Sequence, residues 1–180
     1  PGLRFFAVVT DKLRVLEYVR QRNLRQPLYR YYPNELYDYL VRRLFRDRLH
    51  KDNGYTICFA TRGKADRTAA LRQALEQARR NFYNKKGIPG NAPVQLQAGV
   101  PAQFAGLQAV DYFLWALQRL YEKGEERYVL YLWDAFSLVH DIDDTRQARY
   151  GVYYTQKKPL TAEALRGRRH SAGEQYEPGI

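Results

Sequence analysis

Methionine is absent from this chain of 180 residues, and cysteine and histidine are scarce, at one and three residues. The single Cys58 excludes a disulfide framework, and its place in an apolar run predicts a small buried side chain in a reducing compartment. Three scattered histidines and one cysteine also lack the spacing of a structural zinc site. Any metal is therefore expected to be a hard cation that carboxylates hold.

Two further absences bear on location and completeness. No apolar stretch approaches the roughly 20 residues of a membrane-spanning helix, and the start of the chain lacks the basic region and the apolar core of a signal peptide. We therefore expect a cytoplasmic protein with no membrane partner. An intact gene product normally begins with methionine and this sequence begins with Pro1, so the chain is expected to be a fragment.

Positive charge is in excess. Lysine and arginine number 30 against 19 acidic residues, which gives a formal net charge of +11. Arginine outnumbers lysine, and its planar guanidinium suits phosphate, so nucleic acid is the first expected partner. The alternative is that the charge only keeps the protein in solution. The arginines expected to contact nucleic acid are Arg42, Arg43, Arg46, Arg67, Arg79 and Arg80.

Apolar runs alternate with helical patterns along most of the chain. The runs predict strands at residues 5–10, 55–61 and 94–98. The helical patterns cover residues 11–22, 33–45, 66–86, 105–123 and 125–136. Because strands joined by helices pair in parallel, we expect an α/β layered fold in which the three strands are neighbours in one sheet. The polar stretch 159–180 is expected to be a flexible tail after one domain at residues 1–158.

The most specific segment is GLQAVDYFLWALQR, which begins at Gly106. Gln108 and Asp111 are three residues apart and so share one face of the predicted helix. A carboxylate among leucine, valine and phenylalanine costs free energy unless it is hydrogen-bonded, paired or bound to a cation. Asp111 is therefore expected to be either a metal ligand or the partner of an arginine from a neighbouring element.

Four segments, in order, resemble the domain of unknown function 3800 family: FFAVVTDK, YYPNELYDYLVRRLF, GLQAVDYFLWALQR and YGVYYTQKKPLT. The resemblance covers about residues 3–160 and implies an RNase H-like fold with nuclease activity that depends on Mg²⁺ or Mn²⁺. Members of that family begin with a strand that carries an acidic DExG-like or DDxG-like motif, and this sequence contains none. The resemblance is thus to the C-terminal part of the family, with the opening strands absent.

The residues left to match the family's site are Asp11 and Asp111 as metal ligands, with Gln108 in a supporting or substrate contact. A site for two cations needs several carboxylates, so loss of the opening one should disable it. The expected function is a divalent-metal-dependent nuclease that is inactive in this form. The alternatives are a non-catalytic basic nucleic-acid-binding module and an assembly subunit.

Four other aspartates are candidate site residues. Asp66 is a third catalytic candidate, although an aspartate at a helix start is more often an N-cap. Asp141, Asp143 and Asp144 form the densest acidic cluster. Three aspartates in an expected loop are more often a solvated turn than a cation site, and the spacing of a calcium loop is not met.

The missing opening strands carry a further expectation about partners. They predict an exposed sheet edge beside residues 5–9, or a partner chain or second copy that covers it, because an unpaired edge recruits another strand.

Overall fold

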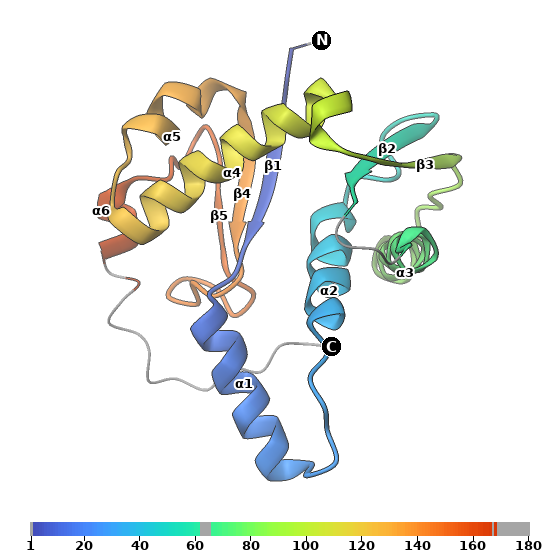
Figure 1. Ribbon diagram of the computed structural model, residues 1–180, viewed down its shortest axis with the longest axis horizontal. Coiled ribbons are helices and arrows are strands. Elements are labelled where there is room, and N and C mark those ends of the chain that lie inside the picture. The colour runs from blue at the N-terminus through green and yellow to red at the C-terminus, as the bar shows by residue number, and fades with distance from the viewer. Residues whose placement is uncertain (1, 62–65, 167, 169–180) are drawn as a thin grey trace. The chain divides into compact units, whose positions relative to one another are not determined.

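The computed structural model describes residues 2–61, 66–166 and 168. It is a mixed α/β protein with small sheets flanked by helices (Figure 1). The chain divides into two compact units, and the single domain expected for residues 1–158 stays a prediction. The terminal unit comprises residues 1–31 and 112–180, and the central unit comprises residues 32–111.

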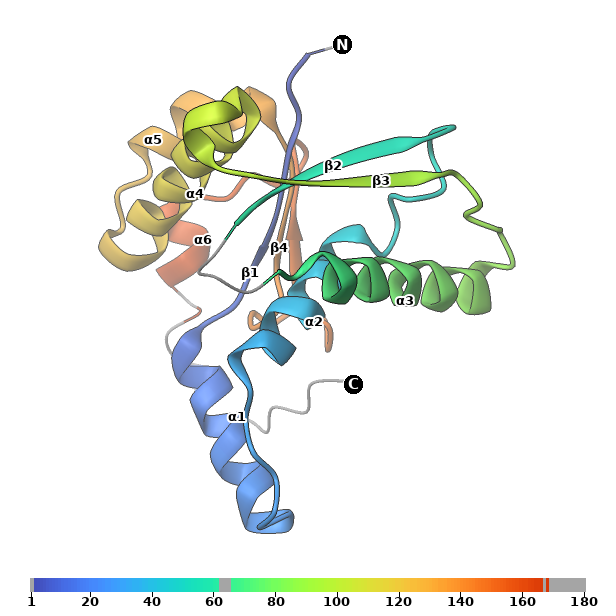
Figure 2. The same cartoon turned by 45° about the vertical axis from the view of Figure 1, so that its right-hand side comes forward.

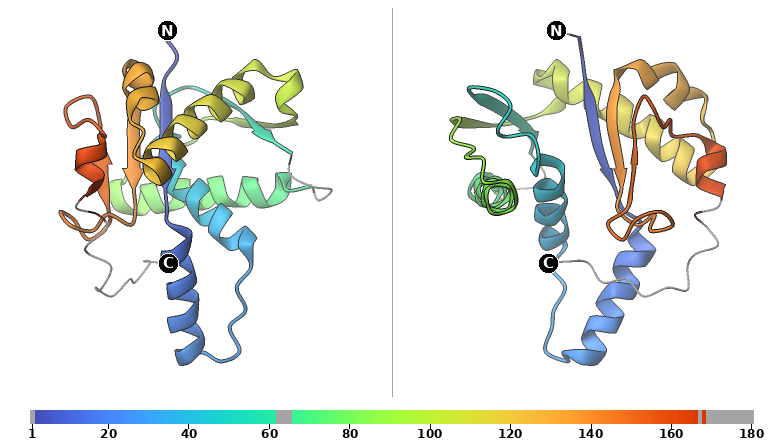
Figure 3. Two further views of the ribbon diagram at one scale, coloured as in Figure 1. Left: turned by 60° about the vertical axis from the view of Figure 1, so that its left-hand side comes forward. Right: turned by 180° about the vertical axis from the view of Figure 1, so that it is seen from behind.

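The terminal unit contains a three-stranded sheet in the order β1-β4-β5 (Figure 3). Its strands are β1 (Phe5–Val9), β4 (Phe136–Asp141) and β5 (Val152–Tyr154). β1 pairs in parallel with β4, and β5 pairs with β4 in the antiparallel direction. The register sets Val9 opposite Asp141, so the carboxyl ends of the two parallel strands coincide.

Helices pack against this sheet and close its core. They are α4 (Ala105–Lys123), α5 (Arg127–Leu132), the short 3₁₀ turn η2 (Trp133–Ala135) and α6 (Ala162–Arg166), and α4 enters the terminal unit at Tyr112. α1 (Lys12–Arg25) follows β1 and, as far as the structure describes the chain, adds no residue to this core. Phe113 of α4 stacks on Phe5 of β1 with ring centroids 4.6 Å apart, and both rings meet Phe136 edge-on. These three aromatic side chains fix α4 against the β1–β4 pair.

The central unit packs two helices against a two-stranded parallel sheet (Figure 2). Its elements are α2 (Pro33–Phe45), β2 (Tyr55–Ala60), α3 (Thr68–Lys86), β3 (Val94–Gly99) and the 3₁₀ turn η1 (Pro101–Gln103), followed by the first residues of α4. Alternate side chains of the strands, Ile57 and Phe59 in β2 and Leu96 in β3, pack onto a core that includes Val41 and Leu75. Alternation of this kind buries one face of a strand.

The observed pairing corrects the expected single sheet. β2 and β3 are parallel neighbours, as predicted, but β1 pairs with β4 in a separate sheet. β4 and β5 were not predicted at all, and the helix expected to reach residue 136 ends at Leu132. Among the described residues β1 has no strand on its other side, which agrees with the predicted sheet edge.

Two smaller expectations also differ from the structure. Cys58 lies in β2 and is half-buried rather than buried. The stretch expected to be a tail from residue 159 begins as part of the core, because Leu160 is fully buried and α6 packs against the same cluster. Leu160 and the short helix α6 after it supply the contact with the core. The polar composition of the stretch as a whole gave no indication of this contact. Residues 169–180 of the expected tail lie outside the described part of the chain.

Candidate functional site

The predicted metal ligands Asp11 and Asp111 have different surroundings. The Asp11 carboxylate caps α1 by accepting a hydrogen bond from Leu13 N at 2.9 Å. Asp111 is exposed on α4, and no described residue donates a hydrogen bond or ion pair to it. Asp11 belongs to the terminal unit and Asp111 to the central unit, so their predicted meeting stays a prediction. The supporting residue Gln108 donates to the Pro101 carbonyl at 2.8 Å.

Asp66 lies one residue before the N-cap position of α3, which is Arg67, and its carboxylate still binds the start of that helix. Its carboxylate is exposed and accepts a hydrogen bond from Thr68 N at 2.8 Å, at the first residue of α3. The hydrogen bonds from Thr68 lower the pKa of the Asp66 carboxyl group. A carboxylate that caps a helix start in this way has a structural function that needs no ligand.

The six arginines expected to bind nucleic acid all belong to the central unit. Several have partners in the protein: Arg67 pairs with Asp38, Arg46 with Asp47 at 3.1 Å and Arg79 with Glu76 at 3.3 Å. Arg42 and Arg43 lie over the ring of Tyr39, at 6.0 and 5.9 Å. Arg80 is exposed and donates to Gln77 at 3.0 Å. Arg80 is thus the most accessible of the six to an outside phosphate.

The acidic cluster expected to be a solvated turn is buried. Asp141, Asp143 and Asp144 expose 0, 1 and 0% of their surface. The expectation was wrong because the segment before the cluster is strand β4, which carries Asp141 into the interior of the terminal unit. Carboxylates at such depth need partners, and segments far apart in the sequence provide them.

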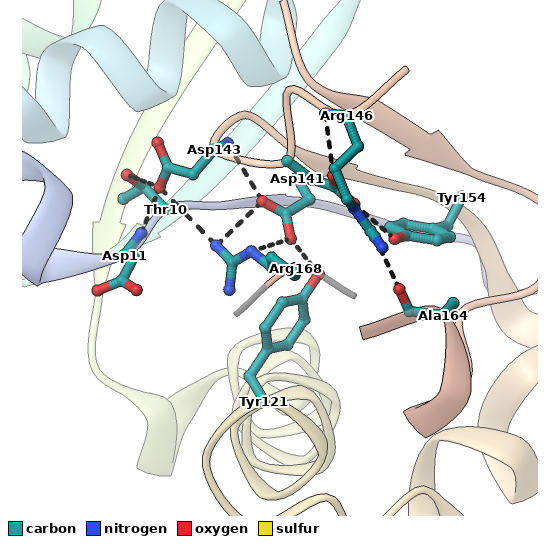
Figure 4. A network of polar contacts seen from close by, with 10 residues as sticks. Thr10, Asp11, Tyr121, Asp141, Asp143, Arg146, Tyr154, Ala164 and Arg168 are labelled. Atoms are coloured by element: carbon teal, nitrogen blue, oxygen red, sulfur yellow. Dashed lines mark hydrogen bonds and ion pairs between the residues drawn. The ribbon is translucent and has the colours of Figure 1, made fainter. Parts of the chain in front are cut away.

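Asp141 is the centre of the network (Figure 4). Its Oδ2 accepts a hydrogen bond from the Tyr121 hydroxyl of α4 at 2.9 Å and lies 3.1 Å from Nε of Arg168. Its Oδ1 accepts from the Arg168 Nη2 at 3.2 Å and from the Asp143 backbone N–H at 3.2 Å. Each oxygen of the Asp141 carboxylate therefore has two donors, and one guanidinium contacts both oxygens.

Asp143 joins the ends of the two parallel strands. Its Oδ2 accepts hydrogen bonds from the Thr10 hydroxyl at 2.9 Å and from the Asp11 backbone N–H at 2.5 Å, both directly after β1 (Figure 4). The Arg168 guanidinium lies 3.9 Å from the same oxygen. The other oxygen, Oδ1, is buried and has no hydrogen-bond partner among the described residues. A buried carboxylate oxygen without a partner is costly, so a hydrogen-bond donor or a cation beside Asp143 Oδ1 would be favourable.

Asp144 serves the fold rather than a ligand. Its two oxygens accept from Nε and Nη2 of Arg146 at 2.7 and 2.6 Å, and Oδ2 also accepts from the Tyr154 hydroxyl at 3.0 Å. Arg146 donates further to the Ala164 carbonyl of α6 at 2.7 Å. Burial alone raises the pKa of the Asp144 carboxyl group, but the bonds from Arg146 and Tyr154 outweigh it and leave the pKa below its ordinary value. Asp144 is thus a charged anchor between β4, β5 and α6.

The pKa values of the other two carboxyl groups are shifted upward. Burial raises the pKa of Asp141 to about 6, although Arg168 and the Tyr121 hydroxyl oppose the shift. Burial also raises the pKa of Asp143, against the hydrogen bonds from Asp11 and Thr10. Each anionic carboxylate is therefore incompletely compensated, and an additional positive charge at this position would be favourable.

Replacing Asp141 by asparagine is expected to change how stability depends on pH in the metal-free protein. The pKa of the Asp141 carboxyl group is about 6 in the folded protein and near 3.8 in the unfolded chain, so the group binds its proton more tightly in the folded state. Its contribution to stability is complete below the lower value and is lost as pH rises through the higher one. The wild type should therefore lose up to about 3 kcal/mol of unfolding free energy relative to Asp141→Asn between pH 4 and 7. Urea denaturation of both proteins in EDTA measures this, and parallel pH curves would contradict it.

The arrangement has defined limits as a metal centre. Among the described residues, no three histidine, cysteine, aspartate or glutamate side chains are placed to hold one metal ion together. Asp141 and Asp143 provide two carboxylates, and Mg²⁺ in proteins commonly uses one or two carboxylates and keeps several water ligands.

Across the described residues, no helix combines the length and the apolar character that crossing a membrane requires.

Comparisons with known proteins identify no relative. No family model, no curated protein and no solved structure matches the chain. The resemblance to the domain of unknown function 3800 family therefore stays a prediction from the four sequence segments, and the site must be interpreted from its own geometry.

Proposed function

We propose that the chain is a divalent-cation-dependent nuclease of RNase H-like type, whose cation is held by Asp141 and Asp143. The observation that carries the proposal is a pair of buried carboxylates at the coinciding ends of β1 and β4, with Asp143 Oδ1 left without a partner. The parallel β1–β4 pair supports the proposed fold, whereas the antiparallel β5 beside β4 departs from the mostly parallel sheet that the resemblance implies. Asp11 contributes its backbone N–H, which orients Asp143.

The residues present fit a hard cation. Oxygen ligands suit Mg²⁺ and Mn²⁺. The hydrogen bonds from Tyr121 and Thr10 hold the two carboxylates in position before a cation arrives. When bound, such a cation would polarise a phosphate oxygen and lower the pKa of a bound water. Asp111, exposed on α4 in the central unit, stays a ligand predicted from the sequence alone.

Nucleic acid is the proposed substrate because the chain carries an excess of positive charge and because exposed cations lie along one helix of the central unit. The formal net charge is +11. α3 carries exposed cations along its length, namely Arg72, Arg80, Lys85 and Lys86. Contacts of this kind to phosphates are independent of base sequence and weaken as salt rises.

Manganese is expected to stabilise the folded protein. At a concentration about one hundredfold above its dissociation constant, Mn²⁺ should add about 2.7 kcal/mol to the unfolding free energy, which raises the melting temperature by roughly 5 °C or more. Asp143→Asn should abolish the rise. Asp134→Asn, at an exposed aspartate of η2, is the matched control and should keep it. Thermal melts with and without Mn²⁺ measure the effect, and Asp111→Asn in the same series tests whether that residue is a ligand.

Cleavage is measured on labelled single-stranded and duplex oligonucleotides with the same variants. Mn²⁺-dependent cleavage by the wild type that Asp143→Asn removes would support the nuclease. Salt-sensitive binding that EDTA leaves unchanged, without cleavage and without metal stabilisation, would favour the alternative of a non-catalytic nucleic-acid-binding module. In that case Arg80→Glu should weaken binding, since Arg80 is the exposed one of the six arginines that were expected to contact nucleic acid.

A further inference from the structure

Arg168 occupies the position between the two carboxylates that a bound cation would compete for. Its guanidinium contacts both oxygens of Asp141, with Nε 3.1 Å from Oδ2 and Nη2 3.2 Å from Oδ1, and lies 3.9 Å from Asp143 Oδ2. Its Cζ lies over the Tyr121 ring, 5.1 Å from the ring centre. Only 16% of the Arg168 side chain is exposed. The charge of the carboxylate pair is thus partly neutralised from within the chain.

We propose that Arg168 is an internal cation that closes this site, so that a divalent cation binds Asp141 and Asp143 only after the Arg168 side chain has left. The inference rests on the proposed metal site and names its regulation. A divalent cation needs a carboxylate oxygen at about 2.0 to 2.5 Å, and the guanidinium already uses both oxygens of Asp141. The guanidinium of Arg168 and a divalent cation would repel each other if both bound the same carboxylate. The Arg168-bound state and the metal-bound state therefore exclude each other.

The structure allows Arg168 to leave while the helix before it stays in place. α6 ends at Arg166, two residues before Arg168. This helix is held independently, since its first N–H, that of Ala162, donates to Glu126 at 2.8 Å and its Ala164 carbonyl accepts from Arg146 at 2.7 Å. Leu160 before it is fully buried. Release of the Arg168 side chain would therefore break its contacts with Asp141 and Asp143 while α6 and Leu160 keep their own.

The expected effect on metal affinity follows from the fraction of time for which the site is open. The apparent affinity for a ligand is the intrinsic affinity multiplied by the open fraction. A site that Arg168 fills for about nine-tenths of the time therefore binds Mn²⁺ about tenfold more weakly than an open one. Removal of the guanidinium should restore the intrinsic affinity. The reverse also holds, because bound Mn²⁺ should displace Arg168 by the same factor.

The test is a calorimetric titration of Mn²⁺ into the full chain, into three variants at Arg168 and Arg166, and into Asp143→Asn. Arg168→Gln should bind Mn²⁺ about tenfold more tightly than the wild type or better, and Arg168→Lys should lie between them because an ammonium lacks the planar fork. Arg166→Gln, at the exposed last residue of α6, is the matched control and should bind as the wild type does. If Arg168→Gln fails to fold by circular dichroism, Arg168→Lys decides alone, and equal affinity to the wild type would then overturn the inference.

The outcomes separate this inference from the proposed function. Equal Mn²⁺ affinity in the wild type and Arg168→Gln, lost in Asp143→Asn, would overturn the closure by Arg168 and leave the metal site intact. Weaker binding in Arg168→Gln would also overturn the closure, since Arg168 would then support the site. Absence of Mn²⁺ binding in every variant would refute the metal site itself and the closure with it.

Discussion

Replacement of Asp144 by alanine is expected to lower the free energy of unfolding by about 3 kcal/mol, because it removes the acceptor of a buried ion pair. Four donors lose their partner: the backbone N–H, Nε and Nη2 of Arg146, and the hydroxyl of Tyr154, which is 1% exposed. The Arg146 side chain is 30% exposed and can turn toward water, which keeps the loss below that of a fully buried pair.

Urea denaturation followed by circular dichroism measures the effect of Asp144→Ala. Asp134→Ala is the control, since Asp134 is exposed and its substitution should cost less than about 0.5 kcal/mol. Tyr154→Phe should cost about 1 kcal/mol, because Asp144 then keeps Arg146. If Asp144→Ala were no less stable than Asp134→Ala, the anchoring role of Asp144 would be refuted.

Gly151→Ala is expected to be comparably destabilising, at about 3 kcal/mol or more, for a reason of backbone geometry. Gly151 has φ +91°, a region that residues with a side chain rarely adopt. A Cβ atom there would lie 2.7 Å from the Cα of Ile142 and closer still to the carbonyl oxygen of Asp141. Both are backbone atoms and cannot move aside as a flexible side chain would, so the end of β4 must shift.

The matched control for Gly151→Ala is Gly106→Ala. A Cβ at Gly106 would meet no atom within 4 Å, and alanine favours a helix over glycine, so stability should rise by up to about 1 kcal/mol. Thermal and urea denaturation of both variants give the comparison. Gly151→Ala should also weaken Mn²⁺ stabilisation, because Asp141 and Asp143 move with β4. Unchanged stability in Gly151→Ala would show that the loop relaxes without effect on the strand.

The local pattern of apolar residues predicted individual helices and strands well, but it predicted poorly which strands pair with one another. The helix expected at residues 105–123 has those bounds as α4, and β1, β2 and β3 lie within one or two residues of their predicted ranges. β4 was missed because its short apolar run follows a helical pattern, and periodicity cannot separate a buried strand from a helix over so few residues. Without β4 the partner of β1 could not be identified.

The candidate site was missed for a related reason. The letters HDIDDT indicate a polar turn when read alone, and burial of Asp141 and Asp143 depends on Thr10, Tyr121 and Arg168, which are distant in sequence. One signal was available, since an apolar run directly before Asp141 is typical of a strand end, where parallel sheets place polar ligands. Arg168 gave no local signal, because nothing in a stretch of polar residues distinguishes the one that reaches the core.

The pairing of β1 with β4 has a consequence for synthesis on the ribosome. The register joins Phe5 to Phe136, so β1 emerges long before its partner strand exists. The central unit, residues 32–111, is complete in the nascent chain before β4 is made. Contacts so far apart in sequence form slowly, and chains fold as their domains emerge. In the interval, the apolar strand that starts at Phe5 lacks its partner, and its apolar side chains stay uncovered by β4.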